Sequence, residues 1–208
     1  MDKELYVIRH GETDLNKQGI VQGRGINSDL NDTGRAQAAS FYKLYKDVPF
    51  DKVYTSTLKR THQTVKGFID AGMPWEQLSG LDELAWGVWE GKANDENAIA
   101  AFKGMMEKWQ SGDFDIHFEG GESPNQVKTR LQEALDVIVN APNEQKVLIC
   151  MHGRAMRLLL CLITGKSLSE MTEFPHQNTT LYKVGLKDGQ FTILEFNNTD
   201  HLKTFPIE

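Results

Sequence analysis

Short apolar runs alternate with amphipathic stretches along most of the chain. A short run of apolar and β-branched residues is typical of a buried strand, whereas apolar residues at every third or fourth position are typical of a helix that covers a core. Runs at residues 5–8, 52–55 and 146–151 therefore predict three buried strands. Helical spacing predicts four helices, at residues 32–45, 58–69, 124–138 and 153–165.

The C-terminal part of the chain has the pattern of a hairpin. Two β-rich runs, at residues 180–186 and 190–196, flank Asp188-Gly189, a pair that favours the tight turn between antiparallel strands. Elsewhere strands and helices alternate, which predicts an α/β fold. We expect a three-layer sandwich with a mainly parallel sheet and one or more antiparallel strands at the C-terminal end, and we interpret residues 1–208 as one domain.

Residues 85–122 break this alternation. They hold three of the four tryptophans, several glycines and only weak periodicity. We interpret them as an insertion that folds over one end of the domain and over the active site. Trp86 and Trp89 are interpreted as packing residues.

Composition narrows the class of protein. The 208 residues hold 23 Lys and Arg against 29 Asp and Glu, a net charge of −6, which disfavours nucleic acid as a partner because nucleic-acid binders usually present a basic face. No run approaches the roughly 18 apolar residues of a membrane helix, and the N-terminal segment lacks an apolar signal region, so we expect a cytoplasmic protein without a membrane partner. Cys150 and Cys161 lie in apolar segments and are expected to be buried, reduced thiols.

Polar and small residues follow each of the three predicted parallel strands. They are Arg9, His10 and Gly11 after the first strand, Arg60 shortly after the second, and His152 and Gly153 after the third. In parallel sheets of this type, ligands bind beyond the carboxyl ends of the strands. Guanidinium groups match the geometry of phosphate, and the helix that begins at Gly153 offers free N–H groups to an anion. This local positive charge in an acidic protein predicts a small anionic ligand.

Five motifs in order resemble those of the histidine phosphatase superfamily, which includes cofactor-dependent phosphoglycerate mutases. The motifs are Arg9-His10-Gly11-Glu12-Thr13 with Asn16; Gln22-Gly23 with Asp29-Leu30 and Gly34; the set Ser56, Leu58, Arg60 and Thr64; the segment from Glu83 to Gly91; and Gly121-Glu122-Ser123 with His152-Gly153. Two positions depart from the pattern. Thr57 stands where the family often has proline, and Leu15 stands where its mutases often have tryptophan; both are interpreted as packing positions.

The resemblance implies roles for individual residues. His10 would be the nucleophile that forms a phosphohistidine, and Glu83 would be the general acid and then the general base. Arg9, Arg60 and His152 would hold the phosphoryl oxygens. Further phosphate-binding groups would be Asn16, Gly11, Gln22 and Gly153. The resemblance implies no metal ion, because arginine and imidazole groups stabilise the developing charge, and we expect this chain to use no cofactor.

The remaining histidines and two further arginines are not assigned to the reaction centre. His62, His117, His176 and His201 are scattered along the chain, without the short ligand spacing of a metal site, and we expect surface or packing roles for them. Arg154 and Arg157 follow His152 on the same predicted helix. We expect one of them to reach the substrate and the other to form a surface salt bridge.

The resemblance leaves three functions open. We favour a metal-independent phosphatase that acts on a small phosphorylated metabolite, because residues 85–122 contain no arginine, whereas the mutases grip a carboxylate with adjacent arginines in this insertion. The segment from Glu83 to Gly91 also resembles the phosphatase branch. The alternatives are a cofactor-dependent phosphoglycerate mutase and, in another class, a phosphate-binding protein without activity. The pattern predicts neither the physiological substrate nor the oligomeric state.

Overall fold

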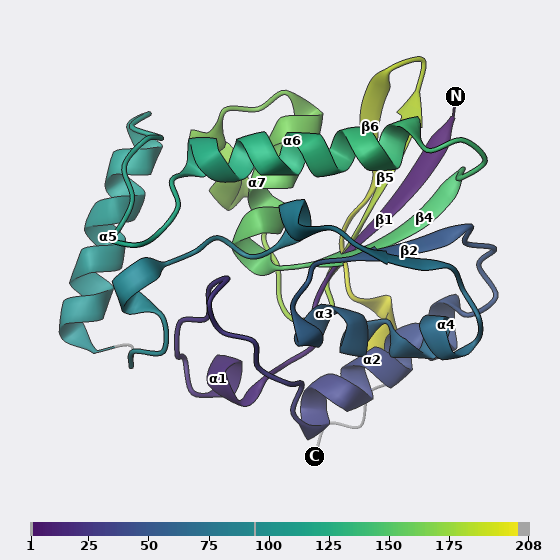
Figure 1. Cartoon of the computed structure of the whole chain (residues 1–208), viewed down its shortest axis with the longest axis horizontal. Coiled ribbons are helices and arrows are strands. Elements are labelled where there is room, and N and C mark those ends of the chain that lie inside the picture. Colours follow the sequence, from purple (N-terminus) through teal and green to yellow (C-terminus); the bar gives the residue numbers. More distant parts are fainter. Residues whose placement is uncertain (1, 94, 204–208) are drawn as a thin grey trace.

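A computed structural model describes residues 2–93 and 95–203, which contain a six-stranded sheet (Figure 1). Its strand order is β3-β2-β4-β1-β5-β6. The strands are β1 (Lys3–Arg9), β2 (Lys52–Thr55), β3 (Trp75–Gln77), β4 (Lys146–Met151), β5 (Leu181–Lys187) and β6 (Gln190–Asn198). The first four are parallel, while β5 pairs antiparallel with both β1 and β6. The predicted mainly parallel sheet with antiparallel strands at the C-terminal end is confirmed.

Helices cover both faces of this sheet (Figure 1). One face carries α2 (Asp32–Tyr45), α3 (Lys59–Thr64) and α4 (Lys66–Asp70), and the other carries α6 (Pro124–Asn140) and α7 (Gly153–Thr164). Successive side chains of a strand point to opposite faces, so Leu5 and Val7 pack in the core beneath α6 and α7, whereas Tyr6 and Ile8 pack in the core beneath α2 and α4. The three-layer architecture is therefore confirmed.

Three local features differ from the sequence prediction. The helix expected over residues 58–69 is broken at Val65, where the hydroxyls of Thr61 and Thr64 donate to carbonyls of the preceding turn, an arrangement that bends helices. The short edge strand β3 was not predicted, because it has three residues and begins directly after Pro74. The helix α5 (Glu96–Gln110) was also missed, although Ala98, Phe102, Met105, Met106 and Trp109 recur at helical spacing and are buried or pack against the core.

The segment of residues 85–122 is anchored by aromatic packing. Trp86 stacks on Trp109 of α5 with ring centroids 5.8 Å apart and contacts Phe102 at 4.9 Å. Trp89 packs on Phe102 and Phe118, so both Trp86 and Trp89 are packing residues, as predicted. In Figure 1, α5 lies beyond the carboxyl ends of the parallel strands, far from the N-terminus. The division of the chain into one domain and an insertion stays a prediction.

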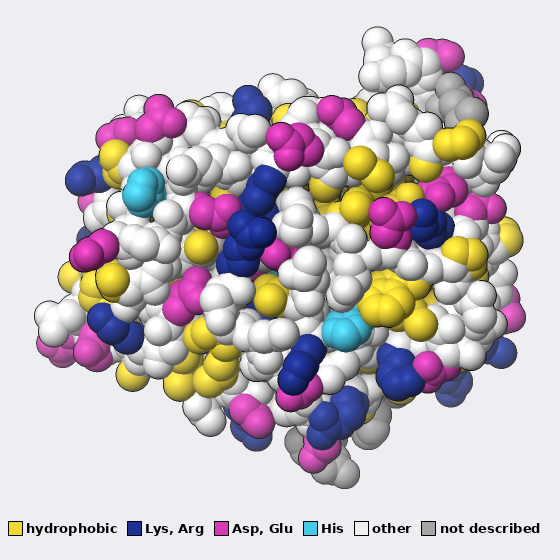
Figure 2. All heavy atoms as spheres, in the orientation of Figure 1, with side chains coloured by type: hydrophobic (Ala, Val, Ile, Leu, Met, Phe, Trp, Pro, Cys, Tyr) yellow, Lys and Arg dark blue, Asp and Glu magenta, His cyan; other side chains and the backbone are white. Residues whose placement is uncertain are grey.

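The structure can be compared with the predictions on surface charge, cysteines and membrane helices. On the face drawn in Figure 2, basic side chains are interspersed with acidic ones. Cys150 and Cys161 are both buried and unpaired. Within residues 2–93 and 95–203, no helix combines the length and the apolar character that crossing a membrane requires.

Candidate active site

The carboxyl ends of β1, β2 and β4 bring the predicted residues together. The backbone N–H of His10 donates to the carbonyl of Met151 (2.9 Å), which joins the end of β1 to the end of β4. The rings of His10 and His152 lie 5.2 Å apart between centroids, and both side chains are buried. Two histidines separated by most of the chain thus face one another at the edge where parallel α/β sheets bind ligands.

The hydrogen bonds of His10 determine its tautomer. Its Nδ1 lies 2.7 Å from the carbonyl oxygen of Gly11, and because that oxygen can only accept, Nδ1 carries the hydrogen. Nε2 is therefore the nitrogen with the free lone pair. Burial, together with the nearby Arg60 and Arg9 guanidiniums, holds the pKa of His10 well below its usual 6.5. The ring is a neutral imidazole with a nucleophilic Nε2.

Gly11 holds the histidine ring from the backbone. Its N–H donates to Oγ1 of Thr64 (2.9 Å), and that hydroxyl donates to the carbonyl of Arg60 (2.6 Å). A Cβ at Gly11 would lie 2.7 Å from the carbonyl oxygen of Gly34, so only glycine fits. Because its N–H is already bonded, Gly11 positions His10, and its predicted contact with phosphate would require exchange of the bond to Thr64.

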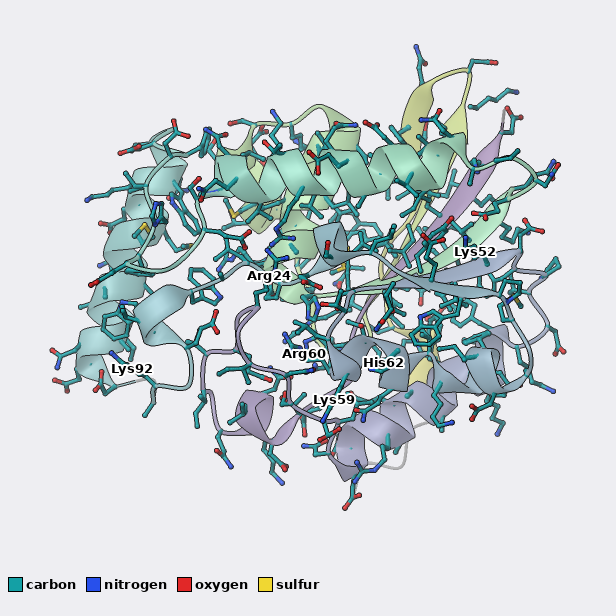
Figure 3. The ribbon with its side chains drawn as sticks, in the orientation of Figure 1. Arg24, Lys52, Lys59, Arg60, His62 and Lys92 are labelled. Carbon is teal, nitrogen blue, oxygen red and sulfur yellow. The ribbon has the colours of Figure 1, made fainter. Side chains whose placement is uncertain are left out.

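Arg60 and His152 form a second connected group. Nε of Arg60 donates to Nδ1 of His152 (3.1 Å), so Nε2 of His152 carries the hydrogen and donates to Oγ of Ser56 (2.7 Å). Arg60 reaches from α3 toward the loop that carries Arg24 (Figure 3), where it donates to the carbonyls of Ile26 (2.6 Å) and Gly23 (3.2 Å). Burial lowers the pKa of Arg60 to about 10, so it stays charged at neutral pH.

Arg9 forms a hydrogen bond with His176, a residue that the sequence did not indicate as part of the site. NH1 of Arg9 donates to Nδ1 of His176 (3.2 Å), while its buried Nε has no acceptor among the described residues. Burial and the charge of Arg9 lower the pKa of His176 to about 3, so this ring is neutral. His176, interpreted as a surface or packing residue, packs against Gly153 and also accepts a hydrogen bond from Arg9 at the site. No local signal marks it, because its place depends on β5 pairing with β1.

Glu83 occupies the N-terminus of α7. Its Oε1 accepts from the N–H groups of Leu84 and Ala155 (both 2.9 Å), and its Oε2 accepts from the N–H of Arg154 (3.1 Å). The first turn of α7 was predicted to be free for an anion, and it is instead capped by this carboxylate. Gly153, predicted to bind phosphate, makes room for His176: a Cβ there would lie 2.5 Å from Cε1 of that ring.

A partly buried ion pair holds the segment that carries Glu83. Arg130 of α6 pairs with both oxygens of Glu122 (2.9 Å each) and donates to the carbonyls of Gly80 (2.8 Å), Asp82 (2.7 Å) and Glu83 (3.0 Å). The guanidinium of Arg130 thus holds the backbone of residues 80–83, and Arg130 is a positioning residue for Glu83. Sequence reasoning missed Arg130, although Glu122 lies in a recognised motif.

The side chains of Asn16 and Gln22 form hydrogen bonds with residues close to His10 in the chain or in contact with it. Nδ2 of Asn178 donates to the carbonyl of His10 (3.0 Å) and to Oδ1 of Asn16 (3.3 Å). Gln22 donates to Oγ1 of Thr13 (2.6 Å), whose hydroxyl caps the short helix α1 (Asp14–Lys17). The structure thus links both residues to the segment that follows His10, and their contact with phosphate stays a prediction.

The remaining predicted residues fall outside the reaction centre or differ in their contacts. His62 stacks on Trp75, His117 is exposed, and His201 packs on Phe41. Thr57, interpreted as a packing position, is exposed: its N–H and its hydroxyl both donate to Oδ1 of Asp82 (2.8 Å each), and a proline could not donate the first. In the part of the chain that the structure describes, no three His, Cys, Asp or Glu side chains cluster as metal ligands would.

Comparison with known proteins agrees with this geometry. A profile of the histidine phosphatase superfamily (branch 1) matches residues 5–199. Phosphoserine phosphatase 1 of Hydrogenobacter thermophilus is 27% identical over 206 residues, or 99% of this chain and 97% of that protein. The fructose-2,6-bisphosphatase TIGAR of Bos taurus is 44% identical over 131 residues, or 61% of this chain and 47% of that protein. The solved structure of YhfR from Bacillus stearothermophilus is 26% identical, with a TM-score of 0.85 over 96% of this chain and 99% of that one.

Proposed function

The chain belongs to the histidine phosphatase superfamily, and we propose that it hydrolyses small phosphomonoesters through a phosphohistidine on His10, without a metal ion. The observation that carries this proposal is the buried, neutral imidazole whose Nδ1–H is held by Gly11, which leaves the lone pair of Nε2 for attack. A neutral imidazole is nucleophilic, whereas a protonated one is not.

The proposed reaction has two steps. In the first, Nε2 of His10 forms a bond to phosphorus while the ester P–O bond breaks, and protonated Glu83 gives its proton to the departing oxygen. In the second, the Glu83 carboxylate takes a proton from water, the water oxygen bonds to phosphorus, and the N–P bond breaks. Inorganic phosphate leaves, and both His10 and Glu83 return to their starting states.

Positive side chains would take the place of a metal ion. Arg9 has an unpartnered buried Nε, and Arg60 makes three hydrogen bonds with five N–H groups, so both have donors to offer to phosphoryl oxygens. His152 lies against Arg60 and faces the ring of His10, but both of its ring nitrogens are already bonded, so it would donate to phosphate only by exchange of its bond to Ser56. Donors fixed before the reaction stabilise the charge that develops on the transferring group.

Two observations favour a phosphatase over a mutase. The first is the match over nearly the whole chain to a protein named as a phosphoserine phosphatase. The second is the lack of arginine in residues 85–122, where Lys103 and Lys108 are exposed and Lys92 lies over the ring of Trp89 (5.1 Å). We therefore assign hydrolysis as the main reaction and a small phosphorylated metabolite as the substrate.

The test compares His10→Ala with His117→Ala, which removes an exposed histidine as the matched control. Phosphate release from p-nitrophenyl phosphate and from phosphoserine is measured with excess chelator present. We expect turnover in the wild type and in His117→Ala, an acid-labile phosphoryl group on the quenched wild type, and neither in His10→Ala. Truncation of His10 should lower the free energy of unfolding by only about 0.5–3 kcal/mol, so the variant stays folded.

Three results would reject the proposal. Turnover that chelation abolishes and added metal restores would reject metal independence. Wild-type turnover by a folded His10→Ala variant would reject the nucleophile. Conversion of one phosphoglycerate isomer to another faster than phosphate release, followed by phosphorus NMR, would identify a mutase.

A further inference from the structure

The arginines of this chain divide into two groups. Arg24, Arg35 and Arg130 each lie within 4.0 Å of a carboxylate. The other four have no carboxylate oxygen within that distance among the residues the structure describes, and all four lie around the carboxyl ends of β1 and β4; they are Arg9, Arg60, Arg154 and Arg157. In an acidic protein, unpaired guanidiniums that gather at one site require a different anion.

Arg154 has almost no hydrogen-bond partner for its guanidinium. The side chain is half-buried, and NH1 lies 3.4 Å from Sδ of Met171, a weak acceptor. Its Cζ lies 5.6 Å from the centre of the Trp86 ring, which orients the group without neutralising it. The backbone N–H of Arg154 meanwhile donates to Glu83, so this side chain begins directly beside the predicted acid.

Arg157 and His176 lie next to Arg154. Nε of Arg157, one turn further along α7, donates to the carbonyl of Phe174 (2.9 Å), which leaves the rest of its fork without a described partner. His176 accepts from Arg9 through Nδ1, so its Nε2 carries a hydrogen that no described residue accepts. Burial lowers the pKa of Arg154 to about 10 and also lowers the pKa of Arg157, and the two guanidiniums stay charged at neutral pH.

The positive charge of the four arginines exceeds the negative charge of one phosphate group. The dianionic phosphate of a monoester would balance Arg9 and Arg60, which flank His10. Arg154 and Arg157 remain, and the nearby Glu83 carboxyl group, which carries the proton at the start of the proposed reaction, has its oxygens already bonded to three backbone N–H groups. A second anionic group on the same substrate would supply the missing charge.

We propose that Arg154, Arg157 and His176 form a second anion subsite, which binds a carboxylate or a second phosphate carried by the substrate. This rests on the proposed function, since it names the class of phosphomonoester that the same site hydrolyses. Guanidinium groups bind both kinds of anion through paired hydrogen bonds. Monoesters that lack a second negative group would then be poorer substrates.

Matched substrate pairs test the subsite. Phosphoserine and phosphoethanolamine differ only in a carboxylate, while fructose 1,6-bisphosphate and fructose 6-phosphate differ in a second phosphate. We expect kcat/KM to be about 10- to 100-fold higher for the doubly anionic member of at least one pair, as for one charge-assisted contact. The pair that shows the preference identifies the anion.

Variants assign the preference to these side chains. Arg154→Gln keeps the backbone N–H that Glu83 accepts and removes the charge, so the preference should fall about 10-fold or more, with Arg154→Lys keeping part of it. Arg157→Gln provides a second, independent variant if Arg154→Gln does not fold. Arg35→Gln removes an exposed arginine paired with Asp32 and serves as the control, with the wild-type preference expected.

The outcomes separate this inference from the proposed function. Turnover of p-nitrophenyl phosphate without preference within either pair, or a preference that survives in both Arg154→Gln and Arg157→Gln, would overturn the subsite and leave the phosphatase standing. Lack of turnover on every ester would instead reject the proposed function. In that case calorimetry on His10→Ala with both substrate pairs still decides the subsite, since equal affinity within each pair would overturn it.

Discussion

Replacement of Glu83 by glutamine would separate the two half-reactions that we propose. Glutamine keeps the shape of the side chain but can neither give nor take the proton. An alkyl phosphate such as phosphoserine has a poor leaving group, so its first step should slow by about 10²- to 10⁴-fold, the usual contribution of general acid catalysis. Nitrophenolate leaves without a proton, so p-nitrophenyl phosphate should still phosphorylate His10.

The structure also predicts what this change does to stability. The Glu83 carboxylate accepts three backbone N–H groups, two at Oε1 and one at Oε2. A glutamine has one acceptor oxygen, so it keeps at most two of these bonds and turns its own NH₂ group toward the remaining donor. A buried donor without a partner costs about 1–3 kcal/mol, and we expect the free energy of unfolding to fall by that amount.

Rapid-quench kinetics with p-nitrophenyl phosphate measures the separation. Because dephosphorylation still needs a base, we expect a burst of nitrophenol near one equivalent of enzyme, followed by a slow steady state. Glu90→Gln is the matched control, since its carboxylate also accepts two backbone N–H groups, from Trp86 and Gly25 (2.9 Å each), and it should show no burst. Equal slowing of both substrates by Glu83→Gln, with no burst, would refute the assigned role.

Two further predictions concern close packing and pH. Gly153→Ala should displace the ring of His176, because the new Cβ would lie 2.5 Å from Cε1, and kcat/KM should fall about 10-fold or more while stability changes by less than about 3 kcal/mol. Gly104→Ala, where nothing lies within 4 Å, should instead stabilise α5 by about 0.5–1 kcal/mol, and wild-type kinetics in Gly153→Ala would contradict the argument. His201 is buried with a pKa of about 4, below its unfolded value of about 6.5, so between these pH values the unfolded chain binds more protons than the folded one. The free energy of unfolding should therefore decrease as the pH is lowered from 6.5 to 4, by up to about 1.4 kcal/mol per pH unit. Denaturant unfolding at pH 5 and pH 7 should show a smaller loss in His201→Gln than in the wild type or in His117→Gln, and equal losses would contradict this assignment.

Elements whose causes are local could be predicted from the sequence. The apolar runs of β1, β2 and β4 are buried as expected, because a strand buried on both faces needs a continuous apolar run. The turn between β5 and β6 follows from Asp188 and Gly189, which both adopt left-handed φ angles (50° and 78°). By contrast, α5 was missed although Phe102, Met105, Met106 and Trp109 face the core at helical spacing, because the segment of residues 85–122 was interpreted as weakly periodic.

The candidate site was predictable in part for the same reason. Residues that directly follow parallel strands must meet at one edge of the sheet, so the proximity of His10 and His152 required only the strand pattern. No comparable rule predicts which polar residues on loops and helices form hydrogen bonds with one another. Glu83 caps α7, which lies 71 and 72 residues further along the chain, and Arg9 meets His176 across 167 residues.

Sequence alone therefore determined the order of strands and helices and the residues at the strand ends, since these depend on neighbours along the chain. Only the tertiary structure decided which buried polar groups satisfy one another: that Glu83 rather than a ligand takes the N–H groups of α7, that Arg130 holds the loop of Glu83, and that Arg154 is left without a carboxylate. A buried donor must find an acceptor wherever the folded chain places one, and that choice depends on distances in space rather than on spacing in sequence.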